Sequence, residues 1–81
     1  MNQNNQVEYY TKDIGEAAAM LTMGRNVIRL EPGEANFWFV FSEKQECENI
    51  SNKYWSGELT VSAKMYSSNL RLLKDRLFAR R

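Results

Sequence analysis

The residue types that most often carry catalysis are sparse in this chain of 81 residues, which contains no histidine and a single cysteine, Cys47. Without histidine the commonest general base and metal ligand is missing, and neither a Ser-His-Asp triad nor a Cys-His pair can form. One cysteine cannot supply a zinc site built on several thiolates. We therefore interpret Cys47 as a small buried apolar residue rather than as a nucleophile.

Phosphate-binding and acid/base motifs are also missing. The four glycines are widely separated, so the chain has no phosphate loop and no dinucleotide fingerprint. Glu43, Glu46 and Glu48 form an acidic cluster, but they fall in the first turns of a predicted helix, where acidic side chains stabilise the helix dipole. We expect a protein that is not an enzyme and that needs no metal and no small-molecule cofactor.

Positive charge is concentrated at the C-terminal end. Residues 1–58 carry five cations and nine anions, whereas residues 59–81 carry six cations and one anion. A molecule polarised in this way can present its basic end to an anionic partner such as nucleic acid. The candidate nucleic-acid-binding residues are Lys64, Arg71, Lys74, Arg76, Arg80 and Arg81. The alternatives are that the two ends of the chain attract each other, or that the cations form a solvated helix face and tail.

Aromatic residues supply the second set of candidates. Residues 36–41 form the clearest predicted strand, with Trp38 and Val40 on the face opposite to its three phenylalanines. Those phenylalanines, Phe37, Phe39 and Phe41, are expected in the core, the alternative being a platform that stacks unpaired bases. If no second layer of helices covers the sheet, Trp38 is exposed and marks a protein interface. Trp55 is the other candidate interface residue, or else lies at the rim of the core.

The elements that position these residues can be predicted from caps and periodicity. A helix is expected over about residues 13–23, because Asp13 and Glu16 have capping-box spacing and an apolar face follows. Residues 26–41 predict a β-hairpin around the Pro32-Gly33 turn. The segment Val7–Tyr10 is either a small edge strand or an extended lead-in to the first helix.

Two further helices complete the predicted fold. Ser42 to Gln45 has the spacing of a second capping box, and Gly57 can end the helix that follows it. Ser62 can cap the last helix, in which one face is apolar. That face is formed by Tyr66, Leu70, Leu73 and Leu77, with Met65, Leu72 and Phe78 expected to broaden it. The methionines Met20, Met23 and Met65 are interpreted as residues that fill gaps in the core.

The whole pattern predicts one small α+β domain over residues 7–79, with a disordered lead-in at residues 1–6 and a basic tail at residues 80–81. A hairpin, or a three-stranded antiparallel sheet, would pack against three helices in the order (β)-α-β-β-α-α. We expect no signal peptide, no membrane association and a cytosolic location, since no apolar run approaches the length of a membrane span.

Several short blocks, in this order and at this spacing, resemble the DUF5659 family. They are Tyr10-Thr11-Lys12-Asp13, an Ala-rich helix ending at Gly24, Phe39-Val40-Phe41, Tyr54-Trp55-x-Gly57, Leu72-Leu73-Lys74 and Arg76-Leu77-Phe78. The resemblance covers about residues 9–78. It implies a small protein of bacteria, their phages and mobile elements, located in the bacterial cytosol, and it implies no known activity and no catalytic residues.

Together these observations predict a small accessory or regulatory binding protein, with nucleic acid as the expected partner of its basic C-terminal helix. The alternative is a protein–protein interaction module, such as a phage-encoded inhibitor of a host protein, or a homodimer.

Overall fold

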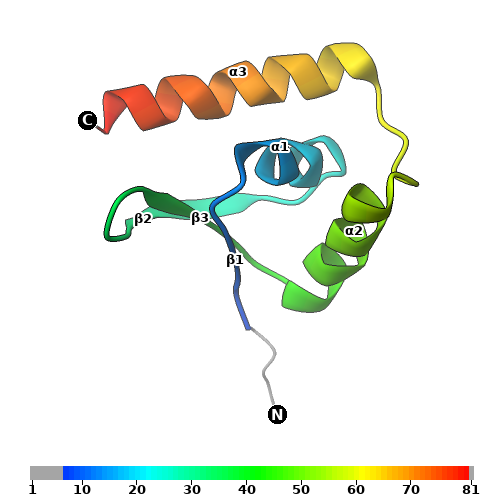
Figure 1. Cartoon of the computed structure of the whole chain (residues 1–81), viewed down its shortest axis with the longest axis horizontal. Coiled ribbons are helices and arrows are strands. Elements are labelled where there is room, and N and C mark those ends of the chain that lie inside the picture. Colours follow the sequence, from blue (N-terminus) through cyan, green and yellow to red (C-terminus); the bar gives the residue numbers. More distant parts are fainter. Residues whose placement is uncertain (1–6, 81) are drawn as a thin grey trace.

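The computed structural model describes residues 7–80 and contains three strands and three helices within that range (Figure 1). The elements are β1 (Tyr9–Thr11), α1 (Ile14–Thr22), β2 (Val27–Pro32), β3 (Phe37–Phe41), α2 (Lys44–Ser56) and α3 (Ala63–Ala79). The predicted α+β class and element order are confirmed, and the uncertain first segment contributes a short edge strand. The predicted disordered lead-in at residues 1–6 lies outside the described residues.

The sheet is antiparallel and has β3 in its centre, in the order β1-β3-β2. The register of β2 shifts between Val27 and Arg29, which leaves Ile28 bulged and 47% exposed. The turn into β3 is closed by a hydrogen bond of 2.7 Å from the Gly33 amide to the Asn36 carbonyl. The turn position suggested a positive φ for Gly33, but Gly33 does not adopt one. It is needed because a Cβ there would lie 2.8 Å from the Asn36 carbonyl oxygen.

The core lies between one face of the sheet and the helices. Figure 1 shows α1 between the sheet and α3, with α2 at the side. The buried cluster comprises Ala17, Ala18, Met20, Leu30, Phe39, Phe41, Cys47, Ile50 and Leu73. Phe39 and Phe41 are at most 1% exposed, so they cannot stack bases, and their predicted place in the core is confirmed. Phe37 is only half-buried at the edge of this core.

The helix boundaries follow two of the three predicted caps. The Asp13 carboxylate accepts from the Glu16 amide at 2.8 Å, and the Ser62 hydroxyl accepts from the Met65 amide at 3.3 Å. The predicted capping box at Ser42 is wrong, because α2 starts after Glu43, which has a φ of 63° and makes no side-chain cap bond. The Lys44 amide instead donates to the Val7 carbonyl at 3.1 Å. The chain before β1 therefore supplies the acceptor for the first backbone amide of α2.

The prediction that a broad apolar face of α3 is buried is also wrong. Leu73 is fully buried, but Met65, Leu72 and Phe78 are 56%, 47% and 71% exposed. The reason is that α3 forms an outer layer, which buries only the stripe that contacts α1. Met23 is exposed as well, so Met20 is the only residue of the predicted methionine set in the core.

Candidate functional site

The orientation of α3 is fixed by contacts along its inner side. Tyr66 donates to the carbonyl of Gly15 at 3.2 Å, and the Asn69 amide donates to the Thr22 hydroxyl at 3.0 Å. One turn further along, Leu73 is buried in the core. Because these three α3 residues hold one side of the helix against α1, its opposite side is turned to solvent.

That solvent side carries what we call the basic face, formed by Lys64, Arg71 and Lys74. All three side chains are exposed. Spacings of seven and three residues keep them on one side of a helix. Lys64 and Arg71 line a shallow hollow together with Ser67 and Ser68, so two hydroxyls lie between two cations. This arrangement can accept a phosphate through charge and hydrogen bonds.

The other predicted cations do not join the basic face. Arg76 is five residues beyond Arg71, about 140° around the helix. Arg80 follows the last turn of α3, and its guanidinium carbon lies 5.6 Å from the centre of the Phe37 ring, beside the hairpin. Arg81 lies outside the described residues. The structure therefore separates the predicted set into the basic face, Arg76 on another side of α3, and Arg80 beside the hairpin.

Three cations outside α3 form the ion pairs of the described part of the chain. Among residues 7–80, Arg25 pairs with Glu43, Lys44 pairs with Glu48, and Arg29 pairs with both Glu8 and Glu31. No ion pair within this range involves a cation of α3 or Arg80. The alternative that the basic end is neutralised by acidic groups of the same chain is therefore not supported within the described part.

Arg29 holds together the face of the sheet that no described helix covers. It donates to Glu8 at 2.9 and 3.1 Å, to Glu31 at 3.0 Å and to the Tyr10 hydroxyl at 3.0 Å. Its hydrogen bond to Glu8 lowers the pKa of that exposed carboxyl group. Because these side chains bond to one another above Val40, that strand residue is fully buried.

Trp38 lies on the same face and is half-buried. The Tyr10 ring meets it edge-on, with the ring centres 6.1 Å apart, and the Lys12 ammonium lies 4.7 Å from the Trp38 ring centre. The prediction that Trp38 is exposed depended on this face having no helical cover, and no helix of residues 7–80 covers it. Neighbouring side chains nevertheless shield much of the indole. Trp38 is therefore a weaker candidate for an interface than the sequence suggested.

Trp55 is more accessible. It lies near the end of α2, is 62% exposed, and contacts the Tyr54 ring edge-on with ring centres 5.0 Å apart. It does not occupy the core rim, the alternative position considered for it. Tyr54 itself is half-buried, and its hydroxyl is so close to Gly15 that a Cβ on that glycine would lie 2.5 Å from it.

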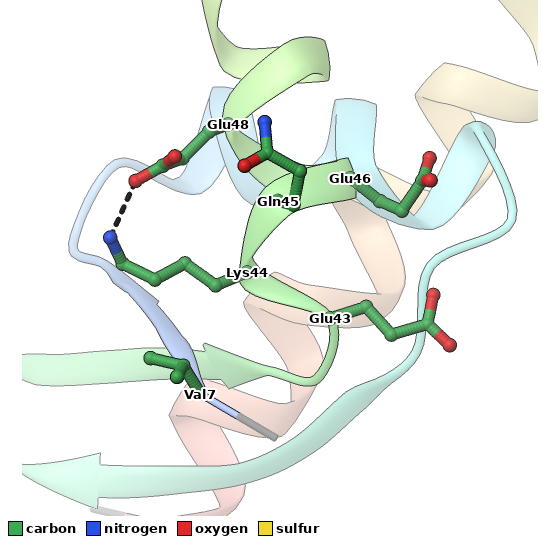
Figure 2. Close-up of a pocket in the computed structure, with 6 residues that line it drawn as sticks. All are labelled: Val7, Glu43, Lys44, Gln45, Glu46 and Glu48. Atoms are coloured by element: carbon green, nitrogen blue, oxygen red, sulfur yellow. Dashed lines mark hydrogen bonds and ion pairs between the residues drawn. The ribbon is translucent and has the colours of Figure 1, made fainter. Parts of the chain in front are cut away.

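The acidic cluster at the start of α2 borders a surface hollow but does not converge on it. Figure 2 shows the Glu48 carboxylate directed toward Lys44, while Glu43 and Glu46 extend to the opposite side. Nowhere in residues 7–80 do three or more acidic or cysteine side chains gather closely enough to hold a metal ion. The cluster therefore resembles a helix start with local ion pairs more than a binding site.

A buried carboxylate is the feature that sequence reasoning missed. Glu16 is 4% exposed and accepts hydrogen bonds of 2.6 Å from both the Tyr9 hydroxyl and the Thr11 hydroxyl. Burial, helped by the bond to Glu16, raises the pKa of Tyr9 to about 12. The capping-box spacing indicated that Glu16 would reach back to Asp13. The extended strand Tyr9–Thr11 instead places two hydroxyl donors beside it.

Cys47 has no feature of a reactive thiol. It is fully buried, and burial raises its pKa to about 11, so the thiol is protonated at neutral pH. Its Sγ lies 3.5 Å from the Ser42 carbonyl oxygen, as expected of a weak donor. The interpretation of Cys47 as a buried apolar residue is confirmed.

A groove of about 350 Å³ lies between the hairpin and the C-terminal half of α3, which extends over the hairpin in Figure 1. We call it the hairpin groove. It is lined by Lys12, Ala35, Asn36, Phe37, Phe39 and Leu77. No local pattern predicts this groove, because its walls come from segments about forty residues apart in the chain.

Comparison with known proteins identifies a family but no function. A family model described as "Domain of unknown function (DUF5659)" matches residues 6–79. No curated protein and no solved structure matches the chain. No helix within residues 7–80 combines the length and apolar character needed to cross a bilayer.

Proposed function

The chain belongs to the DUF5659 family, whose function is unknown, and we propose that it is a non-enzymatic accessory protein that binds the phosphate backbone of nucleic acid through the basic face of α3. The observation that carries this proposal is that the fold makes no use of these charges. Lys64, Arg71 and Lys74 are exposed and form no ion pair within the described residues, although Asp75 lies four residues after Arg71.

Charges that stabilise a fold are normally hydrogen-bonded or paired, as Arg29 is with Glu8 and Glu31. The basic face is instead available to an external anion, and it borders two serine hydroxyls that can donate to phosphate. The concentration of cations in residues 59–81 directs this end of the molecule toward a polyanion. The resemblance to proteins of phages and mobile elements is consistent with a role close to nucleic acid in the cytosol.

The proposal is tested by the salt dependence of binding to a random duplex and a random single strand. Replacing Lys64, Arg71 and Lys74 together by alanine should reduce affinity for both and lower the slope of log affinity against log salt by about 2 to 3. Lys53→Ala removes an exposed cation from α2 and is the matched control. Unchanged affinity and slope in the triple variant would contradict the proposal.

A protein–protein interaction module is the second candidate, and the exposure of Trp55 favours it. At the β2 edge, a partner, whether a host protein or a second copy of this chain, would contact side chains rather than extend the sheet. The free edge of β2 is interrupted by the bulge at Ile28 and ends at Pro32, two features that hinder strand addition. Light scattering of the protein alone tests the homodimer: a dimer mass that Trp55→Ala reduces to that of a monomer would support it.

A further inference from the structure

We propose that the nucleic acid bound by this protein is single-stranded, and that the hairpin groove holds one unpaired base while nearby cations hold its phosphates. This inference rests on the proposed function, which it deepens.

The groove has the size and the wall chemistry that a base requires. Its volume of about 350 Å³ is at the lower end of the range for small-ligand sites. Phe37 and Leu77 form apolar walls from opposite sides, and Phe37 is only half-buried, so part of its ring remains available. Aromatic side chains bind bases of any sequence by stacking, because every base has a π-face. Asn36 adds a side-chain amide that can hydrogen-bond the edge of a base.

The charge around the groove is positive. No carboxylate lines it, and Lys12 lines it with its ammonium directed to the Trp38 ring on the other face of the sheet. On α3, Lys74 and Arg80 lie three residues before and after Leu77, so each is a neighbour of this wall residue on the helix surface. Arg80 also lies over the Phe37 ring. Lys74 and Arg80 thus flank an apolar slot, which matches a nucleotide, a planar base attached to an anion.

The position of Lys74 connects the groove to the proposed backbone-binding surface. Lys74 belongs to the basic face and is also one helical turn from Leu77. A strand whose phosphates follow Lys64, Arg71 and Lys74 along α3 therefore arrives at the mouth of the groove. A base in a duplex is stacked and paired, and reaching the groove would require its extrusion at a cost of a few kcal/mol. An unpaired base has no such cost, so the geometry favours a single strand.

The experiment measures fluorescence anisotropy with three probes: a thymidine strand of about 12 nucleotides, an abasic strand of the same length, and a duplex of that length. All three carry phosphates, but only the first offers free bases. The full chain should bind the thymidine strand about tenfold more tightly than the abasic strand, as expected for one stacked base.

Two variants test whether the preference for the thymidine strand over the abasic strand arises in the groove. Phe37→Leu removes the ring but keeps an apolar wall, and Ala35→Leu narrows the groove from an exposed turn without changing charge. Both should bring the ratio of thymidine to abasic affinity close to one. Trp55→Leu, which removes an exposed aromatic side chain from α2, is the control and should leave the ratio unchanged. The triple alanine variant of the basic face should weaken both strands and preserve their ratio.

The outcomes separate this inference from the proposed function. Equal binding of the three probes would overturn the base-binding groove and leave backbone binding intact. An unchanged ratio in both groove variants would overturn it as well. Failure of every probe to bind at low salt would remove both proposals. Tighter binding of an acidic, phenylalanine-containing peptide than of the thymidine strand would show that the groove takes a protein segment instead.

Discussion

The two sides of the molecule use their polar groups in opposite ways. At the start of α1, the buried Glu16 carboxylate accepts from Tyr9 and Thr11, and the Tyr66 hydroxyl donates to the Gly15 carbonyl. On the outer side of α3, the basic face forms no ion pair among residues 7–80, and Leu72 and Phe78 lie exposed beside it.

This difference distinguishes residues that build the fold from residues that remain available for binding. The inner network joins β1, α1 and α3, so its loss should be measured as lost stability. The outer surface of α3 contributes few contacts to the fold, so its loss should be measured as lost affinity.

The sharpest test uses two adjacent leucines of α3. Leu73 is fully buried and Leu72 is 47% exposed. Leu73→Ala should lower the free energy of unfolding by about 3 kcal/mol, because it leaves a cavity between α3 and α1. Leu72→Ala should lower it by less than about 0.5 kcal/mol. Urea denaturation followed by circular dichroism measures both, and similar losses would contradict the assignment of inner and outer sides.

A smaller loss of stability is expected from Glu16→Gln. The neutral amide accepts more weakly than a carboxylate, and its NH₂ group must face one of the two hydroxyls. We expect the free energy of unfolding to fall by about 2 kcal/mol. Glu46→Gln, in the exposed first turn of α2, serves as the control and should change it by less than about 0.5 kcal/mol. Equal behaviour of the two variants would show that the Glu16 network contributes little.

Alkaline pH should lower the stability of the protein through the same inner network. Burial and the bond to Glu16 raise the pKa of Tyr9 to about 12, and burial together with the bond to Tyr66 raises that of Tyr54 to about 12. A raised folded-state pKa means that the folded protein holds the phenolic proton more tightly than the unfolded chain does. Its contribution to stability is therefore complete below about pH 10 and is lost between about pH 10 and 12.

The measurement is the thermal midpoint across this pH range in the wild type and in Tyr9→Phe. The variant should be less stable near neutral pH and should lose less stability on alkaline titration. Parallel curves for the two proteins would show that Tyr9 does not cause the alkaline loss.

The smallest effect on stability is expected from the triple alanine variant of Lys64, Arg71 and Lys74. Because these cations make no ion pair within the described part of the chain, the free energy of unfolding should change by less than about 0.5 kcal/mol. Its nucleic-acid affinity is nevertheless expected to fall. A large loss of stability would place the basic face among the residues that build the fold.

The fold could be predicted from local signals to a considerable extent. Asp13 and Ser62 cap helices as their types suggested, and Gly57 ends α2 with a φ of 81°. The period-2 alternation of residues 37–41 correctly identified the central strand and its core face. These features are decided within a few residues of the chain, and for that reason they can be inferred from sequence.

Features decided by tertiary contacts could not be predicted. The predicted capping box at Ser42 was wrong because the Lys44 amide donates to the carbonyl of Val7, which is far away in sequence. Phe78 fits an apolar helical stripe, but the stripe that α1 covers is narrower than the apolar pattern. The hairpin groove depends on how far α3 extends over the hairpin, and helix periodicity carries no information about that distance.

The central position of β3 has a consequence for the order of folding. β2 and β3 are joined by the turn at residues 33–36 and can pair as a local hairpin, whereas β1 must return across α1 to reach the opposite edge of β3. Closing that longer loop costs more entropy, so β1 is expected to dock late. Because Tyr9 and Thr11 both belong to β1, Glu16 lacks its hydroxyl donors until that step. The amides of β1 should consequently show the weakest hydrogen-exchange protection in the sheet, and the species lacking β1 is the partly unfolded form expected under native conditions.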